Sequence, residues 1–347
     1  MTGTTRNPLP SSRRPRVSVL LPVRDGERHL PRCVESLRTQ TLTDIEFLVV
    51  DDGSRDSSRE ILEAWARGDE RVRVLPQPRA GLVPALEMAR AHARAPLLAR
   101  MDADDIADPR RLASQLALMD ENPDVVLSGC RIEYFPKERV KDGARRYQRW
   151  LNSLVAPEEI ALDVMVECPI AHPTFMMRAH AVAEVGGYRD VGWPEDYDLL
   201  LRLWEAGGRF AKVPEVLLRW RESADRLSRT DPRYGLEAFR RAKVDVLGRT
   251  LLDGRSGVLV WGAGPTGKAF ARTLLEAGER VRAFVDLDPR KIGQEVYGVP
   301  VVEVSGVGSF EGTFSVAAVS GSGARAEIRR TLLARGQREM VDFCAVA

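Results

Sequence analysis

Two clusters of aspartates in this sequence each follow directly after an apolar run. They lie at residues 51–54 (DDGS) and 102–105 (DADD). Aspartates two positions apart can direct carboxylate oxygens at one hard cation, which is how Mg²⁺ or Mn²⁺ is usually held against a diphosphate. Such a metal would neutralise the charge that builds on a departing nucleoside diphosphate. The second cluster therefore predicts a divalent metal site with Asp102 and Asp104 as ligands.

Each cluster also has a purely structural interpretation. Asp-Gly-Ser at 51–54 is ordinary turn chemistry and is equally typical of a helix N-cap. The cluster at 102–105 could supply an acidic cap to a helix expected over 110–119, with Asp105 and Asp108 as the capping residues. Capping and metal binding can coexist, so both interpretations stay open.

The segments around these clusters alternate between strand and helix patterns. The apolar run 17–21 fits a buried strand, whereas Leu30, Val34 and Leu37 recur at helical spacing. Such alternation predicts a mostly parallel α/β sheet with both faces covered, and ligands of these sheets bind beyond the carboxyl ends of the strands. The expected strands are 17–21, 45–50, 72–75 and 96–101, and the expected helices are 30–40, 58–67, 82–94 and 110–119. Both aspartate clusters and the loop 22–25 then reach the same edge.

Length and charge limit the function classes. A chain of 347 residues suggests about two domains. Hydrophobic residues make up 44% and charged residues 29%, which is usual for a globular protein. The formal net charge is +2, from 52 Lys+Arg against 50 Asp+Glu, and this balance argues against a protein that mainly binds nucleic acid.

The cysteines and the hydrophobic pattern indicate where the protein works. Its four cysteines are scattered without metal-binding spacing, so reduced thiols in a reducing compartment are expected. No apolar run approaches the roughly 20 residues that span a bilayer, and the N-terminus lacks the apolar segment of a signal peptide. We therefore expect a cytoplasmic enzyme, with peripheral contact at the inner face of the membrane as an alternative.

Composition divides the chain into four segments. Residues 1–15 are rich in Pro, Ser, Thr and Arg and are expected to be a disordered tail. The first α/β domain is assigned to 16–222. An Arg-rich stretch with few strand signals, 223–254, is expected to be a helical linker. A second α/β domain is assigned to 255–347.

Several motifs in the first domain together resemble family 2 inverting glycosyltransferases, whose fold is termed GT-A. The resemblance begins with VSVLLPVRDGERHLPRCVESLRTQTLTDIEFLVVDDGSRD at 17–56 and continues through ARMDADDIADPRRLASQ at 99–115. It includes CPIAHPT at 168–174 and ends with GGY at 186–188 and WPEDYDL at 193–199. The order and spacing of these motifs imply a nucleotide-diphospho-sugar transferase domain.

The resemblance implies roles for particular residues. Asp102 and Asp104 match the family's DxD element, with Asp104 the more direct ligand of Mg²⁺ or Mn²⁺ and Asp102 nearer the ribose. Asp52 would accept a hydrogen bond from the base, expected to be the uracil of a UDP-sugar. Arg221 follows Trp220 where the family often has an aromatic-basic pair, and it could meet diphosphate oxygens. The nucleotide pocket would also be lined by Pro22, Val23 and Asp25.

The same resemblance makes Asp196 the catalytic base. An acceptor hydroxyl is a poor nucleophile, so a carboxylate within hydrogen-bond reach assists by taking its proton. The other interpretation of Glu195-Asp196 is an acidic helix N-terminus, since a helical pattern follows at 199–204. For His172 a hydrogen-bonded structural role competes with a place near the donor sugar. The basic, aromatic-containing stretch 131–149 could face the acceptor or a membrane surface, or could simply be a solvated excursion.

The second domain carries a GxGxxG motif between a strand pattern and a helix pattern. Its glycines are Gly262, Gly264 and Gly267, and the acidic Asp286 follows about 20 residues later, as in dinucleotide-binding sites. This short Rossmann-like domain could bind NAD or another nucleotide at those four residues. Only about half of a full dinucleotide-binding domain remains, so a domain that serves assembly or regulation alone is an equal alternative.

The expected activity is inverting, metal-assisted transfer of a sugar from a nucleotide sugar to an acceptor hydroxyl on a carbohydrate or lipid-linked acceptor. Its expected setting is the synthesis of a cell-surface polysaccharide or glycoconjugate. An NAD-dependent sugar or nucleotide-sugar oxidoreductase led by the second domain is the alternative. A non-catalytic module is disfavoured because the acidic set is intact.

Overall fold

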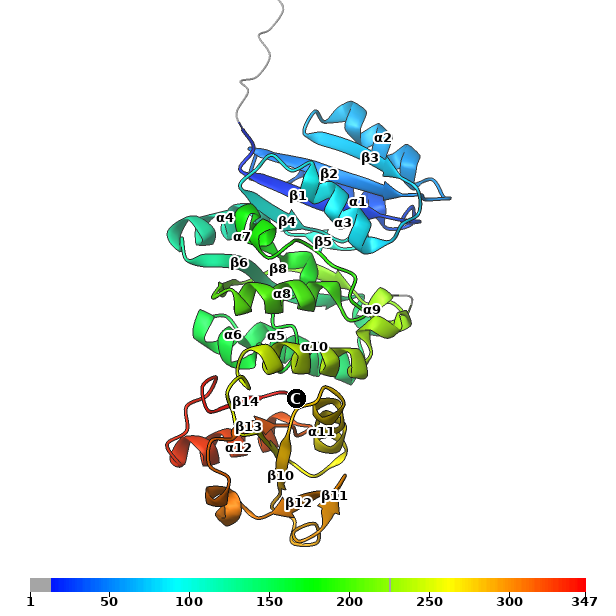
Figure 1. Cartoon of the computed structure of the whole chain (residues 1–347). Helices are drawn as coiled ribbons and strands as arrows, with labels where there is room; N and C mark the ends of the chain where they lie inside the picture. Colours follow the sequence, from blue (N-terminus) through cyan, green and yellow to red (C-terminus); the bar gives the residue numbers. More distant parts are fainter. Residues whose placement is uncertain (1–13, 225) are drawn as a thin grey trace, which may run out of the picture.

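The computed structural model describes residues 14–224 and 226–347. Two α/β units are stacked one after the other, and helix α10 (Leu236–Arg249) lies where they meet (Figure 1). The tail predicted at 1–15 lies outside the described residues except for its last two.

The first unit is built on a mixed eight-stranded sheet. Strands β1 to β4 run parallel, β7 is antiparallel to β4, and β6 and β8 are parallel to each other. In spatial order the strands are β3 (Val72–Gln77), β2 (Ile45–Asp52), β1 (Val17–Val23), β4 (Leu97–Arg100), β7 (Met176–Arg178), β6 (Val125–Phe135), β8 (Arg209–Arg221) and β5 (Ile106–Ala107). The four predicted strands are confirmed, but β1 continues through Pro22. Its ladder with β4 ends at Leu20, which leaves one side of β1 free at the proline.

Helices cover both faces of this sheet. Along β1, Val19 and Leu21 pack in one apolar core and Leu20 in another, because successive side chains of a strand point to opposite faces. Burial on both faces explains why these strands read as continuous apolar runs. The helices are α1 (Leu30–Arg38), α2 (Ser58–Gly68), α3 (Leu82–Ala91), α4 (Arg111–Glu121), α5 (Asp142–Ser153), α6 (Pro157–Asp163), α7 (Ala179–Glu184) and α8 (Glu195–Glu205), with 3-10 turns η1 (Lys137–Arg139) and η2 (His172–Thr174).

The segment after β8 is helical. It comprises α9 (Leu227–Thr230), the 3-10 turn η3 (Pro232–Tyr234) and α10. Buried Lys243 of α10 donates hydrogen bonds to the carbonyl oxygens of Val166 in the first unit and Val346 in the second. Arg329 of the second unit forms an ion pair with Asp163 of the first. This segment and its contacts hold the two units together.

The second unit is a smaller Rossmann-like sheet. Its strands are all parallel except β11. In spatial order they are β11 (Glu295–Val296), β12 (Val299–Val302), β10 (Val281–Val285), β9 (Val258–Trp261), β13 (Phe314–Ala317) and β14 (Phe343–Ala345). Its helices are α11 (Pro265–Glu276), α12 (Ser322–Ala334) and the 3-10 helix η4 (Val304–Ser309). Within the part of the chain that the structure describes, no helix is long and apolar enough to cross a membrane.

Candidate active site

A cleft of about 510 Å³ opens at the carboxyl ends of β1 and β4. It lies where parallel-sheet topology places ligands. Six of the eight residues that were assigned to the active site from the sequence line it: Pro22, Asp25, Asp102, Asp104, Asp196 and Arg221. The strand-end loops and the start of α8 thus bring together side chains that are far apart in the sequence.

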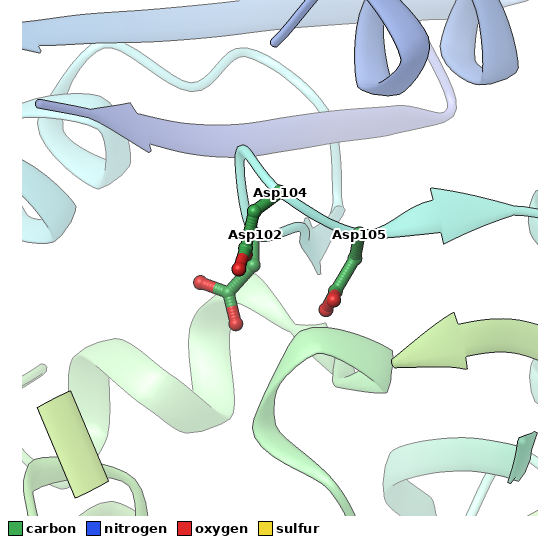
Figure 2. A group of neighbouring side chains, drawn as sticks. All are labelled: Asp102, Asp104 and Asp105. Carbon is green, nitrogen blue, oxygen red and sulfur yellow. The ribbon is translucent and has the colours of Figure 1, made fainter. Parts of the chain in front are cut away.

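Three carboxylates converge in the loop after β4. Figure 2 shows Asp102, Asp104 and Asp105 projecting to the same side of that loop, and their nearest oxygens lie within 4.8 Å of one another. Burial and then the charge of Asp102 raise the pKa of Asp104 to about 6. Burial, and next the charge of Asp102, also raises the pKa of Asp105 well above its usual range. Like charges have therefore accumulated without sufficient compensation, as expected of a site completed by a cation.

The free oxygens of this cluster fit a divalent metal. The buried Oδ2 of Asp105 has no hydrogen-bond partner among the described residues, and Asp104 carries no side-chain ion pair there. Asp102 differs, because one of its oxygens pairs with the buried Arg100 guanidinium. Asp104 is thus the most available ligand, with Asp102 and Asp105 beside it.

The capping role considered for Asp105 is wrong. Its Oδ1 accepts a hydrogen bond of 2.7 Å from the backbone N–H of Arg221 at the end of β8, not from the helix. Asp108 does not cap α4 either: its carboxylate accepts from the N–H of Arg110, the residue before the helix, at 2.9 Å, and α4 has no side-chain cap hydrogen bond among the described residues. Arg221 also donates from Nε to the carbonyl oxygen of Asp104 at 2.8 Å, so the end of β8 fixes the acidic loop from the other side.

Glu195 and Asp196 occupy the first turn of α8, on the wall of the same cleft. Burial and then the charge of Glu195 raise the pKa of Asp196 to about 8. Its Oδ1 accepts from the N–H of Tyr197 at 2.7 Å, as suits an acidic residue at a helix N-terminus. Helix capping and a proton-accepting role are therefore compatible. Asp198 is different: it is buried and ion-paired with Arg202, which is a structural contact.

His172 is hydrogen-bonded inside the protein. Its Nε2 lies 3.0 Å from the Tyr188 hydroxyl, and its Nδ1 lies 3.5 Å from Oε1 of Glu195. Burial, and then the positive charge of Arg100, holds the pKa of His172 well below its usual range. The ring is thus a neutral part of the wall that holds Glu195 in place.

Two residues assigned to the nucleotide pocket, Val23 and Asp52, do not line the cleft. Val23 is buried in the apolar core. Asp52 is 4% exposed, and its carboxylate accepts from the Gln77 side chain and from the backbone N–H groups of Ala80 and Gly81. It thereby binds the N-terminus of α3. Its contact with a base stays a prediction.

Several cleft residues escaped the sequence analysis. They are Arg28, His29, Arg100, Arg226 and Tyr234, whereas Arg139 belongs to the basic stretch 131–149, for which contact with the acceptor or a membrane surface was one interpretation. Arg100 could have been noticed as a charge inside an apolar strand, two positions before Asp102. Tyr234 and Arg226 carry no local signal, because the supposed linker folds back onto the cleft only in three dimensions.

A second cavity, of about 320 Å³, lies at the carboxyl ends of β9 and β10 in the second unit. Gly262, Gly264 and Asp286 line it, whereas Gly267 does not. A Cβ at Gly264 would meet nothing within 4 Å, but a Cβ at Gly267 would lie 1.7 Å from the Gly262 carbonyl oxygen. The second glycine therefore leaves space for a ligand, while the third permits close packing of α11.

Asp286 is already engaged within the protein. Its carboxylate accepts from the N–H groups of Ala263 at 2.7 Å and Asp288 at 2.9 Å, and it pairs with Lys291 at 3.0 Å. It stabilises the glycine loop directly. Lys291 also lines the cavity and places a cation beside this carboxylate.

Comparisons with known proteins support two domains. A family model described as Glycosyl transferase family 2 matches residues 18–186, and one described as CoA binding domain matches residues 253–337. The putative glycosyltransferase EpsE of Bacillus subtilis (strain 168) is 31% identical over 228 residues, 64% of this chain and 79% of that protein. The amylovoran biosynthesis glycosyltransferase AmsE of Erwinia amylovora is 31% identical over 215 residues, 61% and 78% of the two chains.

Solved structures share the fold of the first unit. S. aureus TarS 1–349 in complex with UDP has a TM-score of 0.53 at 16% identity, covering 69% of this chain and 66% of that one. The mannosyltransferase PcManGT from Pyrobaculum calidifontis, in complex with GDP-Man and Mn²⁺, has a TM-score of 0.50 at 18% identity, covering 77% and 76%. The predicted fold class, a GT-A domain followed by a smaller Rossmann-like domain, is confirmed.

Proposed function

The chain belongs to glycosyltransferase family 2, and we propose that it transfers a sugar from a nucleotide sugar to an acceptor hydroxyl with inversion at the anomeric carbon. The observation that carries this proposal is one cleft that is lined both by Asp102 and Asp104 and by the Glu195–Asp196 pair. The first set suits a diphosphate with its metal, and the second suits proton removal from a nucleophile.

Asp196 acts as the general base in this proposal. It lines the cleft, where an acceptor hydroxyl can reach it, and its pKa of about 8 gives it far more proton affinity than an ordinary aspartate. A base whose pKa lies near the working pH combines a useful ionised fraction with a strong drive to accept the proton. Attack by the hydroxyl on the face opposite the leaving group inverts the anomeric carbon in one displacement.

Asp104, with Asp102 and Asp105 beside it, would hold Mg²⁺ or Mn²⁺. When bound, the ion supplies charge neutralisation for the diphosphate leaving group. Arg100 and Arg221 fix the loop that carries these carboxylates, through Asp102 and through the Asp104 carbonyl oxygen respectively. The loop is therefore held in place before ligands arrive, and little reorganisation is needed.

The names of relatives and neighbours support a donor and a setting. TarS is described in complex with UDP and PcManGT with GDP-Man and Mn²⁺, which supports a nucleotide-sugar donor for this chain. We favour a UDP-sugar. AmsE is named for amylovoran biosynthesis, which supports a role in making a cell-surface polysaccharide or glycoconjugate. The NAD-dependent oxidoreductase alternative is not favoured, because the similar proteins are named glycosyltransferases.

The base assignment is tested with Asp196→Asn. Asparagine keeps the shape but cannot take the proton, so turnover should fall by about 10²–10⁴-fold. The affinity for UDP, measured by calorimetry in the presence of Mn²⁺, should be unchanged. Glu184→Gln, an exposed acidic change outside the cleft, is the matched control. Undiminished turnover in Asp196→Asn refutes the assignment.

For the second unit we propose nucleotide binding at the cavity beside Gly264. The open space at that glycine and the match to a CoA-binding domain model support it. A thermal-shift panel of NAD, CoA and UDP tests it, since a ligand that binds only the folded state raises the melting temperature. If none of these ligands raises the melting temperature, the second unit has a structural or assembly role instead.

A further inference from the structure

Two arginines that line the active-site cleft, and a third nearby in α1, have no anionic partner among the described residues. Arg28 lies just before α1 and Arg32 lies in that helix, while Arg139 comes from η1. All three side chains belong to exposed residues, and Arg28 and Arg139 line the cleft. Among the described residues, none of the three has an ion pair or a side-chain hydrogen bond. We call these three residues the arginine rim.

Other arginines near the cleft are paired internally, which sets the rim apart. Arg226 and Arg229 both bind Glu222, and Arg110 pairs with Glu215. Arg100 pairs with Asp102, and Arg221 binds the acidic loop. These contacts give the paired arginines a structural role. No comparable internal role accounts for the rim.

His29 lines the same cleft and is affected by the positive charges of the rim and of Arg221. Burial, and next the charges of Arg221, Arg28, Arg139 and Arg32, lower the pKa of His29. The pKa of Arg221 is lowered by burial, raised by the charges of Asp104 and Asp105, and lowered again by Arg32 and Arg28. Several cations have therefore been brought together at one mouth of the cleft, where they repel one another unless an anion binds.

The position of the arginine rim favours contact with the acceptor over contact with the donor. In the proposed function the donor diphosphate lies against the 102–105 loop, where the carboxylates face the cleft. Arg28 lies in the loop after β1, but Arg32 and Arg139 come from α1 and η1, and all three are exposed to the solvent from which an acceptor arrives. A planar guanidinium offers paired donors that match phosphate oxygens, so arginines suit a phosphate better than a neutral sugar.

We propose that Arg28, Arg32 and Arg139 bind a phosphate group carried by the acceptor, so that the acceptor class is a phosphate-bearing carbohydrate. The phosphate can belong to a lipid-linked carrier or to a phosphate within a saccharide, and both present the same oxyanion to the rim. The inference rests on the proposed transferase function, because it assigns the acceptor side of the same cleft.

Binding of simple phosphates to the full chain tests the proposal. With UDP and Mn²⁺ at saturating concentration, the protein is titrated with decyl phosphate and with glucose 1-phosphate, and decyl glucoside serves as the neutral probe. The double variant Arg28→Ala/Arg32→Ala should bind the phosphate probes about tenfold or more weakly than the wild type, because it loses charge-assisted contacts. Binding by the wild type should also weaken as salt is raised.

A control in the same helix separates local from general charge effects. Arg38 is an exposed arginine in the last turn of α1, and it does not line the cleft. Arg38→Ala should bind both phosphate probes as the wild type does. Binding of both probes supports recognition of phosphate itself, whereas binding of decyl phosphate alone supports a lipid-linked acceptor.

Two results would overturn the inference. One is equal affinity for the phosphate probes in the double variant and in Arg38→Ala. The other is a tenfold loss of UDP affinity in the double variant, which would assign the rim to the donor diphosphate. In that second case the transferase function still stands, so failure of the acceptor proposal can be told from failure of the function itself.

Discussion

The hydroxyl of Tyr234 donates a hydrogen bond of 2.6 Å to Oε2 of Glu195. Tyr234 belongs to η3, beyond the last strand of the first sheet, and it lines the cleft beside the proposed base. The segment that joins the two units therefore completes the active-site wall. Because η3 contacts α10, and α10 in turn contacts α11, the second unit is connected to that wall by direct packing.

Removing this hydroxyl should slow transfer without affecting donor binding. In Tyr234→Phe the partner of Glu195 is lost, and hydrogen bonds to charged groups contribute about 1.5–3 kcal/mol, or roughly tenfold or more in rate. Steady-state kinetics should show a lower kcat at an unchanged affinity for UDP. Tyr297→Phe, at an exposed tyrosine of the second unit, should behave as the wild type. An unaltered kcat in Tyr234→Phe would show that the hydrogen bond has no part in catalysis.

Asp196 should make stability depend on pH. Its pKa rises from 3.8 to about 8 on folding, so the folded protein holds the proton more tightly than the unfolded chain. The stabilisation from this group is complete below its unfolded pKa and is lost as the pH rises through its folded pKa. Asp196→Asn removes that dependence, so its melting temperature should exceed that of the wild type increasingly from acidic pH to about pH 8. Thermal melts in chelator test this, and a difference that is constant with pH would contradict it.

Much of the first unit could be predicted because local and global patterns agree there. The run 45–50 is apolar at every position except Glu46, since both faces of its strand are buried. The acidic loops follow the strands directly, so topology alone placed Asp102 and Asp104 at one edge. Tyr234 could not be predicted, because no residue near it in the sequence indicates that the chain turns back to Glu195. The same holds for the rim, whose members come from separate elements.

Asp52 should contribute to stability whatever its role in binding. Its carboxylate accepts three hydrogen bonds, two of them from backbone N–H groups at the start of α3. Asp52→Asn replaces one acceptor oxygen with a donor and should lower the free energy of unfolding by about 1–3 kcal/mol. Urea denaturation measures this. A variant as stable as the wild type would mean that these contacts are not formed, and a parallel UDP titration would report on the predicted base contact.

The glycine motif of the second unit offers a matched pair of substitutions. Gly267→Ala would place a Cβ 1.7 Å from a carbonyl oxygen, so it should destabilise the second unit by at least the 1–3 kcal/mol or so typical of overpacking. Gly264→Ala meets open space and should fold normally, while narrowing the cavity to a nucleotide. Thermal melts and ligand titrations separate the two effects. Equal stability of both variants would contradict the packing role of Gly267.

Asp105 illustrates where local sequence is ambiguous. Its position before α4 suits a helix cap, but its partner is the backbone of Arg221, far away in the sequence. The end of β8 lies beside the acidic loop because β8 pairs with β5, the strand that follows the loop, and with β6 as far as Arg221. Asp108 makes only a local turn contact with the N–H of Arg110, the residue before the helix. Contacts between distant elements decided which aspartates remain free for a metal.

The proposed function depends most on a metal-assisted nucleotide-sugar site at the 102–105 loop. The direct measurement is calorimetric titration of the full chain with UDP-sugars, with and without Mn²⁺, in the wild type and in Asp104→Asn. We predict that at least one donor binds the wild type, that binding requires Mn²⁺, and that Asp104→Asn loses the metal-dependent part. If the wild type binds the donor equally tightly with and without Mn²⁺, and Asp104→Asn binds it as tightly as the wild type, the metal-assisted site is contradicted.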